Sequence, residues 1–474
     1  MNTVVALIYL LSSIMFILGL KMLTRVKTAR RGNMLSSSAM LLAVLATLLD
    51  LGEVNYTFII AGLAIGGAIG ALMAIRVQMT EMPEMVALFN GFGGGASALV
   101  ASSFMFERAF GKEGSLVELL ALDTTITLFI SILIGAVTLS GSLVAFGKLK
   151  GLVSGQPILF PGNNLVNLVL VASILFMVLY LILFATNPNQ ILLISMMVIA
   201  FSGFLGVLLV TPIGGADMPV VISLLNSYSG LAAAATGFVL ANNMLIICGA
   251  LVGASGLILT QIMCKAMNRS LANVLFGGFG VEDTASSGPG KDEAYHSVKS
   301  CGAEEAAMIF ESARDIIIVP GYGLAVAQAQ HVTKELADLL IANGGNVRYA
   351  IHPVAGRMPG HMNVLLAESN VPHEQLFDLD HINDDFQNAD IALILGANDV
   401  VNPAATKDPN SPIAGMPVLK VWDAKTVFVV KRSLSPGFAA IPNDLFNYEN
   451  NMMLFGDAKK ILTELVHELK EITD

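Results

Sequence analysis

Charged side chains are scarce in this sequence. They make up 13% of its 474 residues, whereas a typical soluble protein has about 25%, and hydrophobic residues make up 55%. The scarcity is uneven: residues 1–270 contain 12 Lys and Arg and 9 Asp and Glu, and residues 271–474 contain the remaining 14 and 27. This distribution excludes a protein that is soluble throughout. The net charge of −13 in the second part argues against nucleic acid as its partner.

Cysteine is rare, and histidine is absent from the apolar part. The three cysteines, Cys248, Cys264 and Cys301, have neither the spacing of a disulfide framework nor that of a metal site, which favours a reducing, cytoplasmic environment. All seven histidines lie at position 296 or later. The apolar part therefore lacks the one side chain whose ordinary pKa lies near neutral pH, and no metal site is predicted anywhere.

Nine apolar runs are long enough to be candidates for helices that cross a bilayer, which need about 20 residues. They lie near residues 4–20, 35–50, 57–75, 86–106, 124–146, 165–186, 190–211, 219–241 and 244–264. No positive side chain precedes the first run, so we do not expect it to be a cleavable signal.

Basic residues predict how these helices are oriented. Ten of the twelve Lys and Arg in residues 1–270 fall in alternate loops, beginning with the cluster from Lys21 to Arg31. Loops rich in Lys and Arg stay in the cytoplasm. The N-terminus is therefore expected outside, and nine crossings deliver the rest of the chain to the cytoplasm.

Small residues one helical turn apart occur in several runs, as at Gly62, Gly66 and Gly70 and at Gly249 and Gly253. This spacing lets helices approach closely in lipid. Tight packing is the simplest explanation and requires no transport role.

Beyond residue 270 the composition changes. Residues 277–311 are rich in glycine and polar residues and are expected to form a linker that ends in a short polar helix. We therefore divide the chain into a membrane domain at 1–270, a linker at 271–311 and a soluble domain at 312–474.

The soluble domain begins with a pattern typical of nucleotide binding. The β-branched run from Arg314 to Val319 predicts a buried strand, and Gly321-Tyr322-Gly323 follows it, with a helix expected to about Ala342. In the order strand, glycine turn and helix, a Gly-x-Gly-x-x-Val326 run indicates a dinucleotide site. The glycines would let the backbone approach a pyrophosphate at the helix N-terminus.

Strands and helices continue to alternate after this motif. Further strands are expected at 346–352, 390–395, 417–422 and 426–431, and helices near 362–369 and 457–470. The chain is therefore predicted to be a polytopic α-helical membrane domain followed by a soluble α/β, Rossmann-like domain with a mostly parallel sheet.

The ends of two strands favour NADP(H) over NAD(H). An NAD site usually has an acidic residue about 20 residues after the glycine turn, but the strand Val347–Pro353 has no carboxylate. Lys431, Arg432 and Ser433 close a later strand and offer two cations and a hydroxyl, which suit a phosphate monoester. The alternative is a solvated strand end with two charges there by chance.

The soluble domain has no recognisable substrate site of its own. We find no nucleophile beside a base, and His352 and His361, which flank a Gly- and Pro-rich loop, are expected to be structural or next to the cofactor rather than catalytic. A nicotinamide site without substrate chemistry needs a partner that presents the other half of a hydride transfer.

Seven long motifs resemble one family. They are Gly214–Val221, Leu225–Gly230, Cys264–Ser270, His352–Asn363, Gly396–Pro403, Gly415–Val418 and Phe455–Lys459. Together they resemble, over essentially the whole chain, the beta subunits of proton-translocating NAD(P) transhydrogenases. The resemblance implies direct hydride transfer from NADH to NADP⁺, coupled to proton entry across the bacterial inner membrane. It also implies a separate alpha subunit that carries NAD(H) and further spans, and an assembly of two alpha–beta pairs in the bilayer.

The resemblance implies which residues contact NADP(H). Together with Gly321, Gly323 and Val326 of the glycine motif, the expected contacts are Tyr322, Val354, Ala355, Gly356, Arg357, Met358, Pro359, Gly396, Ala397, Asn398, Asp399, Gly415, Met416, Lys431, Arg432, Ser433, Gly437, Asp457 and Ala458. Family members bind the cofactor in reversed orientation across the sheet, so the glycine turn need not hold the pyrophosphate.

The expected proton path departs from the family pattern. Many family members have a histidine in the fourth span, where this chain has Asn90. An amide organises water but does not titrate near neutral pH. Either water held by Asn90 and Asn226 bridges the gap, or the alpha subunit supplies an ionisable group, and we favour the second.

Four more residues match family positions linked to coupling. Asp217 matches a position tied to proton release, although it also suits a helix N-cap before the eighth span. Ser255, Gly256 and Arg269 match the link from the ninth span to the soluble domain, although packing explains Ser255 equally well.

Two other interpretations use the same features. A transporter or channel with a nucleotide-sensing cytoplasmic domain would be expected to have the acidic residue after the second strand and to lack Lys431 and Arg432. A membrane anchor for a soluble dehydrogenase would not need Asn90, Asp217 and Asn226 in apolar segments.

Overall fold

A computed structural model describes most of the chain. The described residues are 3–23, 26–50, 56–109, 112, 114–155, 157–158, 160, 162–215, 217–268, 270–276, 295–358, 360–411, 413–437, 439 and 441–473. Arg269, Pro359 and residues 277–294 of the expected linker lie outside them. By its contacts the chain divides into one unit of residues 1–213 and 221–260 and a second of residues 214–220 and 261–474.

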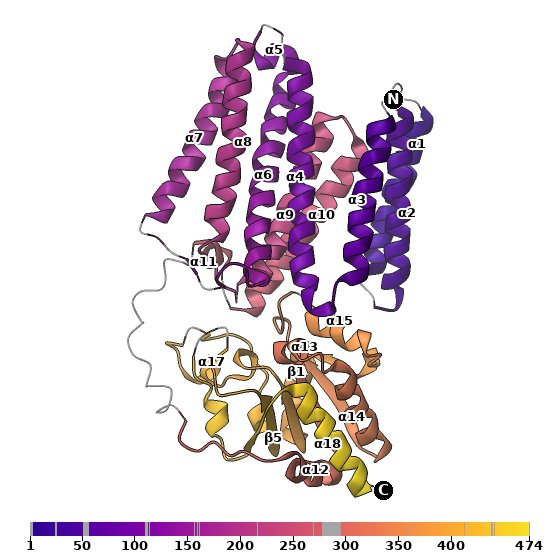
Figure 1. The fold of residues 1–474 in the computed structure, drawn as a ribbon, viewed down its shortest axis with the longest axis vertical. Coiled ribbons are helices and arrows are strands. Elements are labelled where there is room, and N and C mark those ends of the chain that lie inside the picture. The colour runs from indigo at the N-terminus through magenta and orange to yellow at the C-terminus, as the bar shows by residue number, and fades with distance from the viewer. Residues whose placement is uncertain are drawn as a thin grey trace. The chain divides into compact units, whose positions relative to one another are not determined.

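Nine helices among the described residues are long and apolar enough to cross a membrane, which confirms the nine predicted spans (Figure 1). They are α1 (Thr3–Leu23), α2 (Val26–Asp50), α3 (Tyr56–Arg76), α4 (Met82–Ala109), α6 (Leu122–Leu149), α7 (Asn163–Leu183), α8 (Pro188–Val210), α9 (Met218–Val239) and α10 (Asn243–Ala266). The short helices α5 (Leu116–Leu120), α11 (Leu271–Phe276) and α12 (Ala303–Ser312) lie outside these spans.

Glycines set how closely the membrane helices pack. A Cβ atom on Gly135 of α6 would lie 2.5 Å from the carbonyl oxygen of Gly94 in α4, and one on Gly249 of α10 would lie 2.7 Å from that of Gly230 in α9. Only glycine fits such backbone contacts. In α3, by contrast, no described residue is buried and a Cβ on Gly66 would meet nothing within 4 Å. The expected tight packing is therefore present around Gly249 but is not made by α3 within the described part of this chain.

The soluble domain has a six-stranded parallel sheet in the order β3-β2-β1-β4-β5-β6, which confirms the predicted α/β fold. The strands are β1 (Asp315–Pro320), β2 (Asn346–Ile351), β3 (Leu376–Asp378), β4 (Ile391–Leu395), β5 (Thr426–Lys431) and β6 (Asn451–Phe455). The helices are α13 (Tyr322–Val326), α14 (Gln330–Ala342), α15 (His361–Glu368), α16 (Leu379–Ile382), α17 (Ala404–Lys407) and α18 (Ala458–Thr473).

Both faces of the sheet are covered, as a parallel sheet requires. Val427 and Val429 of β5 face a core that includes Phe386 and Phe446. Phe428 lies between them in sequence and points to the other face, where it stacks on Phe310 of α12 with ring centroids 5.2 Å apart. This alternation explains why the central strands are continuous apolar runs.

Parts of the sheet and one helix differ from the prediction. Residues 417–422 are not a strand: Pro417 cannot donate a ladder hydrogen bond, the N–H of Leu419 bonds to the carbonyl of Val400, and Val421–Asp423 form a 3-10 turn. Strands β3 and β6 were not predicted, because β3 has three residues and β6 has no β-branched side chain. The helix expected to run to Ala342 is broken at Gln328, whose φ is +49°.

Candidate functional site

The predicted cofactor residues gather at one edge of the sheet. All six strands are parallel, so the segments that follow β1, β2, β4, β5 and β6 leave from the same, carboxyl edge. The strand order reverses between β1 and β4, and ligands of such sheets bind at this switch point. The topology therefore brings together residues that are up to 137 positions apart, from Gly321 to Ala458.

The glycine turn after β1 packs against the turn after β4. The N–H of Gly321 donates to the carbonyl of Leu395 and that of Gly323 to the carbonyl of Gly396, both at 2.9 Å. A Cβ on Gly321 would lie 2.5 Å from the Cα of Ala397, and one on Gly323 would lie 2.6 Å from that of Gly396. This contact alone requires both glycines, so the pattern does not by itself indicate a pyrophosphate. Val326 ends the five-residue helix α13 and is exposed.

The segment after β2 lies against the glycine turn. The guanidinium carbon of Arg357 lies 4.5 Å from the centre of the Tyr322 ring, a favourable cation–π contact. Gly356 has a φ of +105°, which glycine adopts readily. Ala355 is buried, whereas Val354 and Met358 are partly buried.

Two histidines bracket this segment, and both are neutral. His352 and His361 are 2% and 1% exposed. Burial lowers the pKa of each to about 4; Arg357 lowers that of His361 further, and the bond to Pro417 partly offsets the effect at His352. Neither ring is therefore a cation at neutral pH.

The turn after β4 holds the loop after β5. The Oδ2 atom of Asp399 accepts a hydrogen bond of 3.0 Å from the N–H of Ala439. A Cβ on Gly437 would lie 2.7 Å from the same carboxylate oxygen, so a larger residue there would have to displace the carboxylate. The carboxylate thus holds Ala439 and lies against Gly437, so two predicted contacts, Asp399 and Gly437, meet.

The basic triplet does not act as one group. The Nζ atom of Lys431 donates to the carbonyl of Ser435 and lies 5.4 Å from the centre of the Phe446 ring. Burial lowers the pKa of Lys431, and the nearby charge of Asp399 partly restores it. Arg432 and Ser433 are exposed. Within the triplet, Arg432 is therefore the cation that faces solvent.

A buried amide in the turn after β4 has an unused donor. The Nδ2 atom of Asn443 donates to the carbonyl and to the Oδ1 atom of Asn398, at 3.1 and 3.0 Å. The Nδ2 atom of Asn398 is buried and has no partner among the described atoms. A buried donor without a partner costs about 1–3 kcal/mol, so this site suits a ligand with acceptor oxygens. Sequence reasoning missed Asn443, because it lies outside all of the recognised motifs.

The remaining predicted contacts have clear local roles. Gly415 has a φ of +72° and, with Met416, Pro417 and Lys420, lines a cavity of about 540 Å³. Asp457 caps α18, since its Oδ1 atom accepts the N–H of Lys459 at 3.0 Å, and Ala458 is buried in the first turn.

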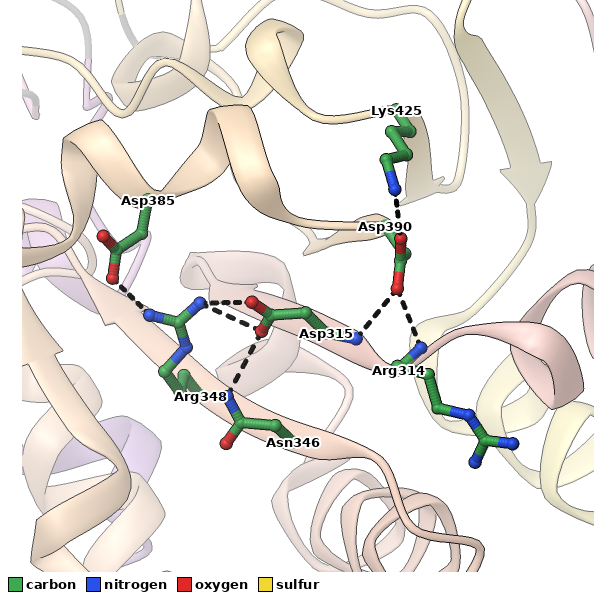
Figure 2. Close-up of polar contacts among 7 residues, drawn as sticks. All are labelled: Arg314, Asp315, Asn346, Arg348, Asp385, Asp390 and Lys425. Carbon is green, nitrogen blue, oxygen red and sulfur yellow. Dashed lines mark hydrogen bonds and ion pairs between the residues drawn. The ribbon is translucent and has the colours of Figure 1, made fainter.

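The opposite, amino edge of the sheet carries an ion-pair network that includes none of the predicted contacts. Figure 2 shows Arg348 between Asp315 and Asp385, and Asp390 bonded to Lys425 and to the backbone N–H groups of Arg314 and Asp315. The Lys425 ammonium, followed by the two N–H groups, lowers the pKa of Asp390 to about 2. The network joins the starts of four strands and is structural.

Two of the candidate residues in the membrane helices, Asn90 and Gly256, lie in tight contacts. Asn90 of α4 is buried, and its Nδ2 atom donates to the carbonyl of Ile222 in α9 at 3.2 Å. Asn226, one turn further along α9, is partly buried. A Cβ on Gly256 would lie 2.6 Å from the backbone nitrogen of Ser227, whereas Ser255 is exposed. Asp217 is partly buried and directly precedes α9.

Other polar groups between these helices were not predicted. The buried Lys148 at the end of α6 donates to the carbonyls of Thr211 and Ile213 just after α8, where free carbonyls and the helix dipole favour a cation. The hydroxyls of Ser131 in α6 and Thr236 in α9 lie 2.6 Å apart. Neither contact has a local sequence signal, because each joins distant segments.

Known proteins match the chain over nearly its full length. The family described as NAD(P) transhydrogenase beta subunit matches residues 5–468. Two relatives from Rhodospirillum rubrum, both called NAD(P) transhydrogenase subunit beta, are 50% identical over an alignment of 471 residues, and the match covers 97% of this chain and 98% of each relative. The match includes all nine candidate membrane helices and the α/β domain. The chain therefore belongs to the NAD(P) transhydrogenase beta subunit family, and it is the subunit of an enzyme that has an alpha subunit as its partner.

Proposed function

We propose that the α/β domain binds NADP(H) at the carboxyl edge of its sheet and exchanges hydride with NAD(H) held by the alpha subunit, coupled to inward proton movement through the membrane helices. The observation that carries the proposal is that the strand order brings the motif-bearing turns after β1, β2, β4 and β5 to one edge. Membership of the family already implies that an NAD(P) cofactor is bound; the form of the cofactor and its site are the proposal.

The residues at this edge fit such a cofactor. The Arg357–Tyr322 pair offers a cation and a ring face, and the Nδ2 atom of Asn398 offers a buried donor. Arg432 and Ser433 would bind the 2′-phosphate that distinguishes NADP(H) from NAD(H). When bound, NADP(H) supplies a nicotinamide carbon that gives or takes hydride. Direct transfer needs the two reacting carbons about 3–3.5 Å apart, so these residues must leave the nicotinamide open to the partner.

The membrane helices would carry the proton. Asn90 and Asn226 do not titrate near neutral pH, and of the two alternatives we favour an ionisable group supplied by the alpha subunit over a path of water held by these amides. Asp217 would take or release the proton, and Ser255, Gly256 and Arg269 would link α10 to the soluble domain.

The orientation follows from the basic loops. We place the protein in the bacterial inner membrane, with the N-terminus in the periplasm and the soluble domain in the cytoplasm. The membrane domain would be residues 1–270, the linker 271–311 and the NADP(H) domain 312–474. Two alpha–beta pairs would form the assembly, as the resemblance implies.

Proton coupling and cofactor exchange are tested together in inverted membrane vesicles. The chain is co-expressed with its alpha subunit, and reduction of an NAD analogue by NADPH is followed. A pH-sensitive dye records proton movement at the same time. Both signals should appear together, and neither without the alpha subunit. Turnover without any proton movement, or turnover by this chain alone, would contradict the proposal. Cofactor binding that only gates an ion flux would support the transporter or channel with a sensing domain.

A further inference from the structure

The rings of His352 and His361 hold the segment between them by the same kind of bond. The N–H of Val354 donates to Nδ1 of His352 at 3.2 Å, and the N–H of Arg357 donates to Nδ1 of His361 at 3.1 Å. A ring nitrogen that accepts carries no proton, so each neutral ring has its hydrogen on Nε2. Both rings thus have the same tautomer, and both accept from the backbone of residues 353–358.

His361 fixes the part of the segment that lies on the glycine turn. A Cβ on Gly356 would lie 2.5 Å from Nδ1 of His361, so the backbone passes directly over the ring. The bond to the N–H of Arg357 sets where this residue leaves the backbone, and its guanidinium lies over Tyr322. The Tyr322 and His361 ring centroids are 6.4 Å apart.

His352 connects residues 353–358 to a second segment, residues 415–417. Its Nε2–H donates to the carbonyl of Pro417 at 2.7 Å. Met416, the preceding residue, is a predicted cofactor contact. One ring thus sets the distance between the segment after β2 and the segment at 415–417.

We propose that His352 and His361 are positioning residues, which hold residues 353–358 against Tyr322 and against residues 415–417 in the shape that receives NADP(H). The inference rests on the proposed function, because it takes these segments as part of the cofactor site. It assigns the two rings to backbone geometry and not to contact with the cofactor.

The test at His361 separates the accepting nitrogen from the rest of the ring. The Oδ1 atom of asparagine occupies the place of Nδ1, so His361→Asn keeps the acceptor and His361→Leu removes it. Loss of the bond at a buried N–H is expected to raise the KM for NADPH about tenfold in His361→Leu and less than about threefold in His361→Asn. The KM for the NAD analogue, which binds the alpha subunit, should stay within about twofold in both.

His352 offers two complementary variants. His352→Asn keeps an acceptor for Val354 but loses the bond to Pro417, whereas His352→Gln keeps a donor for Pro417 but loses the acceptor. Each should raise the KM for NADPH less than His352→Leu does. His467→Asn is the matched control, because this histidine is exposed on α18 and makes none of these contacts.

All variants are made in the full chain, co-expressed with the alpha subunit and assayed in vesicles beside the unchanged protein. An equal rise in the KM for NADPH in His361→Asn and His361→Leu, or no change in either variant, would overturn the inference. An equal rise in the KM for NADPH and in the KM for the NAD analogue would also overturn it. If His361→Leu does not accumulate, Gly356→Ala displaces the ring while leaving it intact, and an unchanged KM for NADPH would then overturn it. Failure of the unchanged protein to bind NADP(H) would instead refute the proposed function.

Discussion

At the scale of single residues, Lys431 and Arg432 have different surroundings although they are neighbours. Lys431 closes the loop after β5 through the carbonyl of Ser435, and Arg432 is exposed. The sequence suggested one phosphate-binding triplet. We therefore propose that Lys431 holds the shape of this loop and that the guanidinium of Arg432 binds the phosphate.

Removing each cation should therefore have a different effect. Arg432→Ala is expected to weaken NADP(H) binding by about tenfold, because it removes a charge-assisted bond to the 2′-phosphate, and Lys431→Ala to weaken it less. Fluorescence titration of NADPH measures both. Lys425→Ala, a cation at the opposite edge of the sheet, is the control and should leave binding unchanged. Equal binding by Arg432→Ala and the unchanged chain would show that the 2′-phosphate lies elsewhere.

The two neutral histidines also predict how stability depends on pH. Their pKa of about 4 lies below the ordinary 6.5, so the unfolded chain binds more protons between these values. Stability should fall as the pH falls from 6.5 towards 4, by on the order of 3 kcal/mol per ring at most. Asp390, with a pKa of about 2 against 3.8, should add a further loss below pH 3.8.

Thermal unfolding of the purified chain in detergent at pH 7, 6, 5 and 4 tests this dependence. The combined variant His352→Asn with His361→Asn should have a shallower fall in Tm over this range, whereas Asp390→Asn should keep the slope above pH 4. An unchanged slope in the double histidine variant would contradict the assignment.

At the scale of elements, close backbone contact explains several of the glycines in the membrane helices but not those of α3. Gly135→Leu should prevent α6 from packing on α4, because even a Cβ there would lie 2.5 Å from the carbonyl oxygen of Gly94. Gly66→Leu in α3 should be tolerated when the chain is expressed without its partner, since its Cβ would meet nothing within 4 Å.

The yield of folded protein in detergent, measured by size-exclusion chromatography, compares the two helices directly. A large loss for Gly135→Leu beside near-normal recovery of Gly66→Leu is expected. Similar recovery of both would mean that the α4–α6 contact does not limit folding.

Elements with a strong local signal were predicted, and those without one were not. The runs at β1, β4 and β5 are apolar and β-branched, so they read as buried strands. Residues 417–422 carry the same signal but include Pro417, and tertiary contacts hold them outside the sheet. Strand β6 reads Asn-Met-Met-Leu-Phe and depends on pairing with β5 for its conformation.

At the scale of the whole molecule, the candidate site could likewise be predicted only where it has a local sequence signal. The turns after the strands were recognised from their motifs, and parallel topology explains why they meet. The histidine bonds, the bridge from Asn443 to Asn398 and the contact between Asp399 and Ala439 were not predicted. Each depends on how distant segments pack, and packing has no local sequence pattern.

The fold is in keeping with a chain that is one subunit of an enzyme. The described α/β domain has one strand-order reversal with motif residues around it, which fits one dinucleotide, and we propose that the alpha subunit holds the other. The membrane helices contain no histidine, and we propose that the proton path uses Asp217 and an ionisable group of the partner.

The most direct test of this account is the NADPH-driven reduction of an NAD analogue in inverted vesicles that contain both subunits, with Asp217→Asn as the variant and proton movement recorded at the same time. We predict that the unchanged protein shows turnover and proton movement together, and that Asp217→Asn loses both by at least about tenfold while still binding NADP(H). Normal proton-coupled turnover in Asp217→Asn would contradict the account.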